Sequence, residues 1–154
     1  ADRIFVMDSG KIMQSGTPED IYANSSNPFV ANFIGMTNFI EGQVLDKDSI
    51  KVDNQQIAIN SHSYKKGTKV IIAARPEYVQ LAEKNSSNTF VGRVVDVEFL
   101  GSFQRIHLET SIMPDQPLIA DKPMIDNFSK SIAIGDNLSF TLSPNHLNVY
   151  ECDN

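Results

Sequence analysis

The sequence predicts a mainly β protein, a β-barrel or sandwich that follows a short strand–helix segment. From Thr37 onward, short runs rich in Val, Ile and Phe alternate with turn residues at regular intervals, a pattern typical of all-β folds. Residues 1–35 differ, because two clear helix-start signals lie close together there. A chain of 154 residues, 41% hydrophobic and 21% charged, suits one main core in a soluble protein.

The first 35 residues are expected to form two strands and two short helices. Residues 3–7, which are apolar except for Arg3, precede a turn and suit a buried strand, and residues 11–14 are expected to return as a second strand. Thr17 and Asn27 are expected N-caps, because each is followed by a proline at the first helical position. Gly35 is expected to end the second helix and to mark the boundary with the barrel.

The remaining strands are expected at residues 38–45, 49–53, 56–59, 69–75, 78–81, 89–99, 103–109, 117–120, 137–142 and 147–150. Residues 90–96 loosely echo residues 39–46 after a one-residue gap, with Phe90 matched to Phe39. We interpret this echo as two similar barrel strands and not as an internal repeat. Residues 113–135 contain three prolines and are interpreted as a long excursion or loop.

Charge and cysteine content exclude several classes of protein. The net charge of -6 argues against nucleic acid as a partner, because affinity for phosphates needs a basic face, and the pair Lys65-Lys66 is too small a patch. Cys152 stands alone, so an intramolecular disulfide is impossible and a reducing compartment is the simpler assumption. The histidines and aspartates lack the spacing of zinc or calcium sites.

Three sequence motifs together resemble the end of the ATPase domain of ABC importers, just past that family's switch histidine. They lie at residues 1–4 with 10–12, at residues 14–22 and at residues 27–35. In the second half, Ala74-Arg75-Pro76-Glu77 resembles a phrase of the accessory domain called TOBE, a transport-associated OB-type barrel. Residues 99–102, 134–136 and 144–150 also match. The resemblance covers nearly the whole chain, most loosely at residues 46–66 and 111–133.

The resemblance implies two domains: residues 1–35 as the tail of a nucleotide-binding domain and residues 36–154 as an OB-like TOBE regulatory domain. The chain lacks an initiator Met and is expected to be part of something longer, and the resemblance implies that it is a C-terminal fragment of the ATP-binding subunit. The sequence contains neither the phosphate loop Gly-x-x-x-x-Gly-Lys-Ser/Thr nor a Leu-Ser-Gly-Gly-Gln signature. We therefore expect no catalytic, cofactor or metal site here, with ATP and Mg bound only in the full-length parent.

Two functions remain open. The first is an accessory and regulatory module of an ABC importer, cytoplasmic at the inner face of the cell membrane. Its expected partners are a second copy of the subunit, the membrane subunits through the ATPase domain, and a regulatory protein or small ligand. The second is a free-standing OB-type barrel that binds a small oxyanion, but such a binder has no reason to carry residues 1–35. A single-strand nucleic-acid binder is disfavoured by the acidic balance and few aromatics.

Seven residues are candidates for an interface or a structural role: Arg75, Pro76, Glu77, Gly101, Ser102, Phe29 and Phe33. The Arg-Pro-Glu motif could contact a partner, but the favoured interpretation is structural: the proline fixes a strand exit while the two charges pair with neighbouring residues. Gly101 lies between two apolar strands, where a tight connection favours positive φ. The two phenylalanines share an apolar helix face that packs on the first strands or docks on a partner.

Overall fold

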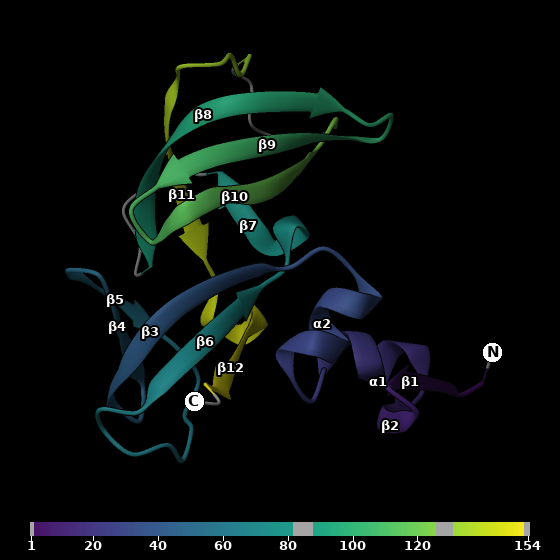
Figure 1. Ribbon diagram of the computed structural model, residues 1–154. Coiled ribbons are helices and arrows are strands. Elements are labelled where there is room, and N and C mark those ends of the chain that lie inside the picture. Colours follow the sequence, from purple (N-terminus) through teal and green to yellow (C-terminus); the bar gives the residue numbers. More distant parts are fainter. Residues whose placement is uncertain (1, 82–87, 126–130, 153–154) are drawn as a thin grey trace. The chain divides into compact units, whose positions relative to one another are not determined.

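The structure, a computed structural model, describes residues 2–81, 88–125 and 131–152. The chain divides into two compact units, Ala1–Thr37 and Asn38–Asn154 (Figure 1). The division falls just beyond Gly35, where the sequence predicts a boundary. The assignment of the first unit to the tail of an ATPase domain stays a prediction.

The first unit is a β-hairpin followed by two short helices. Its elements are β1 (Ile4–Asp8), β2 (Lys11–Gly16), α1 (Pro18–Ala23) and α2 (Pro28–Ile34). Both predicted N-caps are confirmed: the Thr17 hydroxyl accepts the Asp20 N–H at 3.1 Å, and the Asn27 side chain accepts the Val30 N–H at 2.9 Å. Val30 also packs with buried Val6 and Ile21 in a small core.

In its described residues, the second unit contains two five-stranded sheets. One has the order β12-β6-β3-β4-β5 and the other the order β10-β9-β8-β11-β7, and buried residues of both sheets share one hydrophobic core. The predicted mainly β fold is confirmed. The strands are β3 (Asn38–Asp46), β4 (Ser49–Val52), β5 (Gln55–Ala58), β6 (Lys69–Ala74), β7 (Val79–Leu81), β8 (Thr89–Phe99), β9 (Phe103–Thr110), β10 (Met113–Pro123), β11 (Asn137–Leu142) and β12 (Leu147–Glu151).

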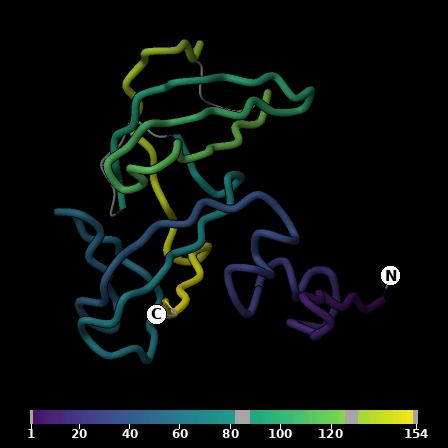
Figure 2. Tube along the Cα trace, in the orientation of Figure 1, coloured from purple at the N-terminus to yellow at the C-terminus, as the bar shows by residue number. Residues whose placement is uncertain are grey.

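The two sheets are built in the same way, so the second unit is an internal repeat. Strands β3 to β6 form most of one sheet, and the next strand along the chain, β7, joins the other. Strands β8 to β11 form most of that second sheet, and β12 returns to the first. Figure 2 shows this return as the yellow end of the tube, passing from one sheet to the other. The interpretation of the sequence echo as no more than two similar strands is therefore wrong.

The repeat aligns without a gap, one residue away from the register expected from Phe39 and Phe90. Asn38 corresponds to Asn88: the Asn38 amide bonds the backbone N–H and C=O of Ile119 in β10, and the Asn88 amide bonds the same two groups of Ala58 in β5, at distances of 2.7 to 2.8 Å. Each half of the unit thus holds the third strand of the other half through a buried asparagine.

Two glycines occupy equivalent places in the repeat, on β3 and β8. A Cβ at Gly42 would lie 2.5 Å from the Ile50 side chain and 2.9 Å from a backbone oxygen, and a Cβ at Gly92 would lie 3.0 Å from Leu108. A bulge follows in both strands, since the register with the next strand shifts after Val44 and after Val94. Close approach of neighbouring strands explains why glycine stands at both positions.

Short 3-10 turns carry the chain from one sheet to the other. Turn η1 (Pro76–Tyr78) joins β6 to β7, and η2 (Pro144–His146) joins β11 to β12. The Tyr78 and His146 rings stack with their centroids 3.9 Å apart and their planes 3° from parallel. The two crossings therefore meet, and the stacked rings tie them together.

Residues 113–123 form one strand, which contains the strand expected at 117–120 and corrects the rest of this part of the predicted loop. Strand β10 is an edge strand, where proline is tolerated because one side needs no ladder hydrogen bonds. Its register with β9 shifts between Met113 and Leu118, and Pro114 and Pro117 lie inside that irregular stretch. Residues 126–130 of the predicted loop lie outside the described residues.

Candidate functional site

Arg75 and Pro76 lie at the exit of β6 and are both buried, with Arg75 8% exposed. Burial lowers the pKa of the Arg75 guanidinium, an effect that the neighbouring Tyr150 partly offsets. Tyr150 is also buried, and burial raises the pKa of its phenol. A buried arginine beside a buried tyrosine fits the structural interpretation of this phrase, and contact with a partner stays a prediction.

Glu77, in contrast, is exposed at the second position of η1. Nearby, the Arg105 guanidinium donates two hydrogen bonds to the Asp121 carboxylate, at 3.0 and 3.1 Å. The pKa of Arg105 is raised, first by this hydrogen bond, with smaller contributions from the charges of Glu98 and Glu77. Glu77 therefore belongs to a charged surface beside the crossing.

Gly101 and Ser102 lie in the connection between β8 and β9, apart from the Arg-Pro-Glu phrase. Gly101 has φ of +83°, as the sequence predicts, and the Leu100 N–H closes the turn by bonding the Phe103 carbonyl at 2.9 Å. The Ser102 carbonyl accepts the Met124 N–H at 3.0 Å. Large exposed hydrophobic side chains gather along these segments: Phe99, Leu100, Met124 and Ile125.

Phe29 and Phe33 lie on α2 in the first unit, with their ring centroids 6.1 Å apart. Phe33 is 63% exposed, so it is not buried against the first strands as the default interpretation expects. The hairpin of the same unit also exposes Phe5, Met7 and Ile12. This unit therefore presents several uncovered apolar side chains, and their partner stays a prediction.

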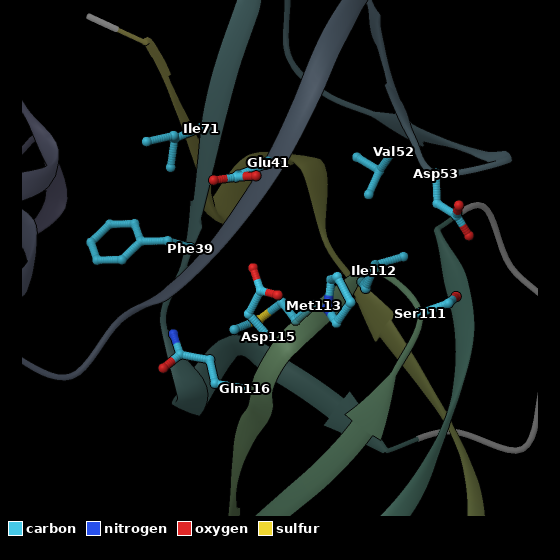
Figure 3. A pocket seen from close by; sticks show the side chains of 11 residues that line it. Phe39, Glu41, Val52, Asp53, Ile71, Ser111, Ile112, Met113, Asp115 and Gln116 are labelled. Atoms are coloured by element: carbon cyan, nitrogen blue, oxygen red, sulfur yellow. The ribbon is translucent and has the colours of Figure 1, made fainter. Parts of the chain in front are cut away.

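A cavity of about 580 Å³ lies within the second unit (Figure 3). Phe39, Glu41 and Ile71 line it from β3 and β6, and residues 111–116 line it from the turn before β10 and from the irregular start of that strand. Val52 and Asp53 complete it at the end of β4. The bonds between Asn38 and Ile119 hold β10 beside the start of β3 and thereby fix this wall.

The charged side chains that line this cavity are all acidic. Its lining includes the carboxylates of Glu41, Asp53 and Asp115, and the described residues that line it include no Lys, Arg or His. No ion pair joins any of these carboxylates to another described residue. Sequence reasoning missed this site because its residues come from separate strands and have no common spacing.

A second cavity, of about 530 Å³, shares Glu41 and Asp53 with the first and is also lined by Lys51, Lys69 and Cys152. Its charge is more balanced. Among the described residues, no group of three or more His, Cys, Asp or Glu side chains is placed to hold a metal ion. None of the helices in the described part of the chain is long and apolar enough to cross a lipid bilayer.

Curated relatives match along most of this chain. The Spermidine/putrescine import ATP-binding protein PotA of Clostridium acetobutylicum is 28% identical over 149 residues, 97% of this chain and 40% of that protein. The protein of the same name from Acetivibrio thermocellus is 33% identical over 149 residues, which again cover 97% of this chain and 40% of that protein. The Fe(3+) ions import ATP-binding protein FbpC 2 of Rhizobium meliloti is 34% identical over 133 residues, 79% of this chain and 34% of that protein. The chain thus spans about two fifths or less of these relatives.

Among solved structures, the cytoplasmic molybdate-binding protein ModG has a similar fold, with a TM-score of 0.62 over 73% of this chain and 94% of that one. At 13% identity this likeness concerns the fold alone. The relatives confirm the resemblance to ATP-binding subunits of ABC importers. Since residues 72–149 match the TOBE domain, the chain belongs to the TOBE domain family.

Proposed function

We propose that this chain is an accessory and regulatory part of the ATP-binding subunit of an ABC importer, and that it helps two such subunits associate without hydrolysing ATP itself. The observation that carries the proposal is the match of 97% of the chain to import ATP-binding proteins that are much longer than it is. The parent protein would then work in the cytoplasm against the membrane subunits of the importer, with ATP and Mg held outside this segment.

The absence of a phosphate loop makes the first test a binding experiment. Titration calorimetry of the 154-residue chain with Mg-ATP should give no saturable heat beyond that of a titration with Mg alone. A dissociation constant in the micromolar range would contradict the non-catalytic part of the proposal.

Self-association is the second test, because exposed apolar patches are uncommon on monomers. Light scattering coupled to gel filtration should detect a dimer. Phe33→Asp in the first unit and Phe99→Asp in the second then separate two surfaces, since only the variant that alters the interface should shift the mass toward the monomer. A monomeric wild-type chain at high concentration would contradict the role in dimerisation.

The oxyanion-binding alternative receives less support from this chain. The likeness to the molybdate-binding protein concerns the fold, and the larger cavity is lined by Glu41, Asp53 and Asp115, which would repel an anion. Titration with molybdate tests the alternative directly. Saturable binding of molybdate would restore it.

A further inference from the structure

The segment between β5 and β6 contains a histidine whose two ring nitrogens both form hydrogen bonds. The Tyr64 N–H donates to Nδ1 of His62 at 2.9 Å, and Nε2 of His62 lies 2.9 Å from the Asp46 carbonyl oxygen at the end of β3. A backbone N–H can only donate and a carbonyl oxygen can only accept. Nδ1 must therefore be without a hydrogen and Nε2 must carry one, so this arrangement requires the neutral ring.

The ring holds the middle of a segment whose two ends are fixed by other bonds. Tyr64 lies near the centre of this segment, and its N–H has the His62 ring as acceptor. Backbone bonds fix the segment on either side of it, from the Ile59 N–H to the Asp48 carbonyl and from the Gly67 N–H to the Val44 carbonyl, both at 2.9 Å. Losing the bond to the ring should therefore loosen the part around Tyr64 and leave the two ends in place.

Tyr64 connects this segment to the edge of the first sheet. Its side chain is partly buried against the shared core, and its hydroxyl donates to the Val149 carbonyl in β12 at 3.5 Å. The Cys152 N–H bonds the Lys69 carbonyl, so by the alternation of antiparallel pairs Val149 directs its main-chain groups away from β6. Because β12 is an edge strand, Tyr64 occupies a main-chain acceptor that another strand could otherwise use.

We propose that His62 is an acid-sensitive latch that holds Tyr64 against the edge of the first sheet. Protonation places a hydrogen on Nδ1, which then faces the Tyr64 N–H as a second donor, so the bond between them is lost. Histidine changes its charge between about pH 5 and 8, so the latch is closed at the upper end of this range and opens as the pH falls through it. The proposal goes beyond the accessory role above, because the latch requires neither ATP nor an importer.

Charged groups on the surrounding elements act on the ring in both directions. They are Asp46 of β3, Lys47 and Asp48 of the turn that follows, Lys65 and Lys66 of the same segment, and Glu151 of β12. The pKa of Asp46 is lowered, first by the Asp48 N–H and with a smaller contribution from the charge of His62, so this carboxylate attracts the protonated ring. The lysines repel it. Whatever pH this balance sets for protonation, the protonated ring cannot accept the Tyr64 N–H.

NMR spectroscopy of the 154-residue chain tests the latch in two ways. The ring nitrogen shifts of His62 at about pH 8 should identify the tautomer with its hydrogen on Nε2. Protection of the Tyr64 amide from hydrogen exchange, corrected for the intrinsic effect of pH, should fall about three- to tenfold between about pH 8 and pH 5, as expected for one lost hydrogen bond. Protection of the Gly67 amide, which bonds a backbone carbonyl, should not change.

Variants separate the ring from its surroundings. In His62→Ala the Tyr64 amide should be weakly protected at both pH values. In His62→Asn it should stay protected at both, because an Asn side chain can accept the N–H two residues on and does not titrate. The control His107→Gln, at a histidine of β9 that bonds Glu98, should keep the wild-type response.

Circular dichroism melts show whether each variant folds, and the tautomer of the wild-type ring tests the latch even if His62→Ala does not. A hydrogen on Nδ1 at about pH 8 would overturn the proposal. So would equal protection of the wild-type Tyr64 amide at both pH values, or a pH response that persists in His62→Ala or His62→Asn. None of these results bears on the Mg-ATP or light-scattering tests, so the accessory role stands or falls separately.

Discussion

Replacing Gly101 by Val separates backbone strain from steric conflict. The φ of +83° lies in the region that side chains with a Cβ avoid, but a Cβ built there meets nothing within 4 Å. The whole cost must therefore come from the backbone, and we expect Gly101→Val to destabilise the second unit by about 1 to 3 kcal/mol. Gly101→Asn should cost less, because Asn tolerates positive φ. Ser102→Ala should cost least, since Ser102 is exposed.

Urea denaturation measures these differences. With a slope of about 2 kcal/mol per M, a loss of about 2 kcal/mol lowers the midpoint by about 1 M. The slope should stay unchanged if only the folded state is strained. An unchanged midpoint for Gly101→Val would refute the strained-turn argument and would move Gly101 and Ser102 to the interface candidates, to be tested by association instead of folding.

Three further outcomes are expected from the same denaturation assay. Asn38→Ala should lower the free energy of unfolding by about 2 to 4 kcal/mol, because it leaves the Ile119 backbone groups of β10 unpaired. The control Asn145→Ala, at an exposed residue, should lower it by less than about 0.5 kcal/mol. Equal losses of stability in the two variants would contradict this argument. Gly42→Ala should cost about 1 to 3 kcal/mol and more than Gly92→Ala, whose neighbours are farther away; the reverse order would contradict the packing argument. The pKa of Asp46 is lowered from 3.8, first by the Asp48 N–H, so the advantage of wild type over Asp46→Ala should be present above pH 3.8 and should shrink as the pH falls below it; an advantage that grows in acid would exclude this hydrogen bond as its source.

Local signals predicted the secondary structure well. Thr17 and Asn27 were recognisable because capping depends on residues within one helical turn, and Gly101 because positive φ at a tight turn needs no distant contact. Strand β10 was expected only at residues 117–120, because proline usually ends a strand, whereas it runs from Met113 to Pro123. Its position at the edge of a sheet, which relaxes that rule, depends on tertiary structure.

The repeat and the cavity show what local signals cannot give. The sequence comparison matched Phe39 with Phe90 because these are the largest shared side chains. The structural register instead pairs Asn38 with Asn88 and Gly42 with Gly92, which occupy their positions because of contacts with other strands. The cavity joins residues from β3, β4, β6 and β10, so its acidic lining becomes visible only after the sheets are placed.

Strands β7 and β12 each join the sheet of the other half, and this exchange affects how the chain folds during its synthesis. Strand β6 can pair with β3 as soon as both are synthesised, but its other edge waits for β12, which ends at Glu151. During translation that edge stays open to pairing with other chains, a known hazard of unpaired strands. Folding of the second unit therefore finishes only after β12 has been synthesised, and termination before that point leaves an incomplete first sheet for chaperones or proteases to handle.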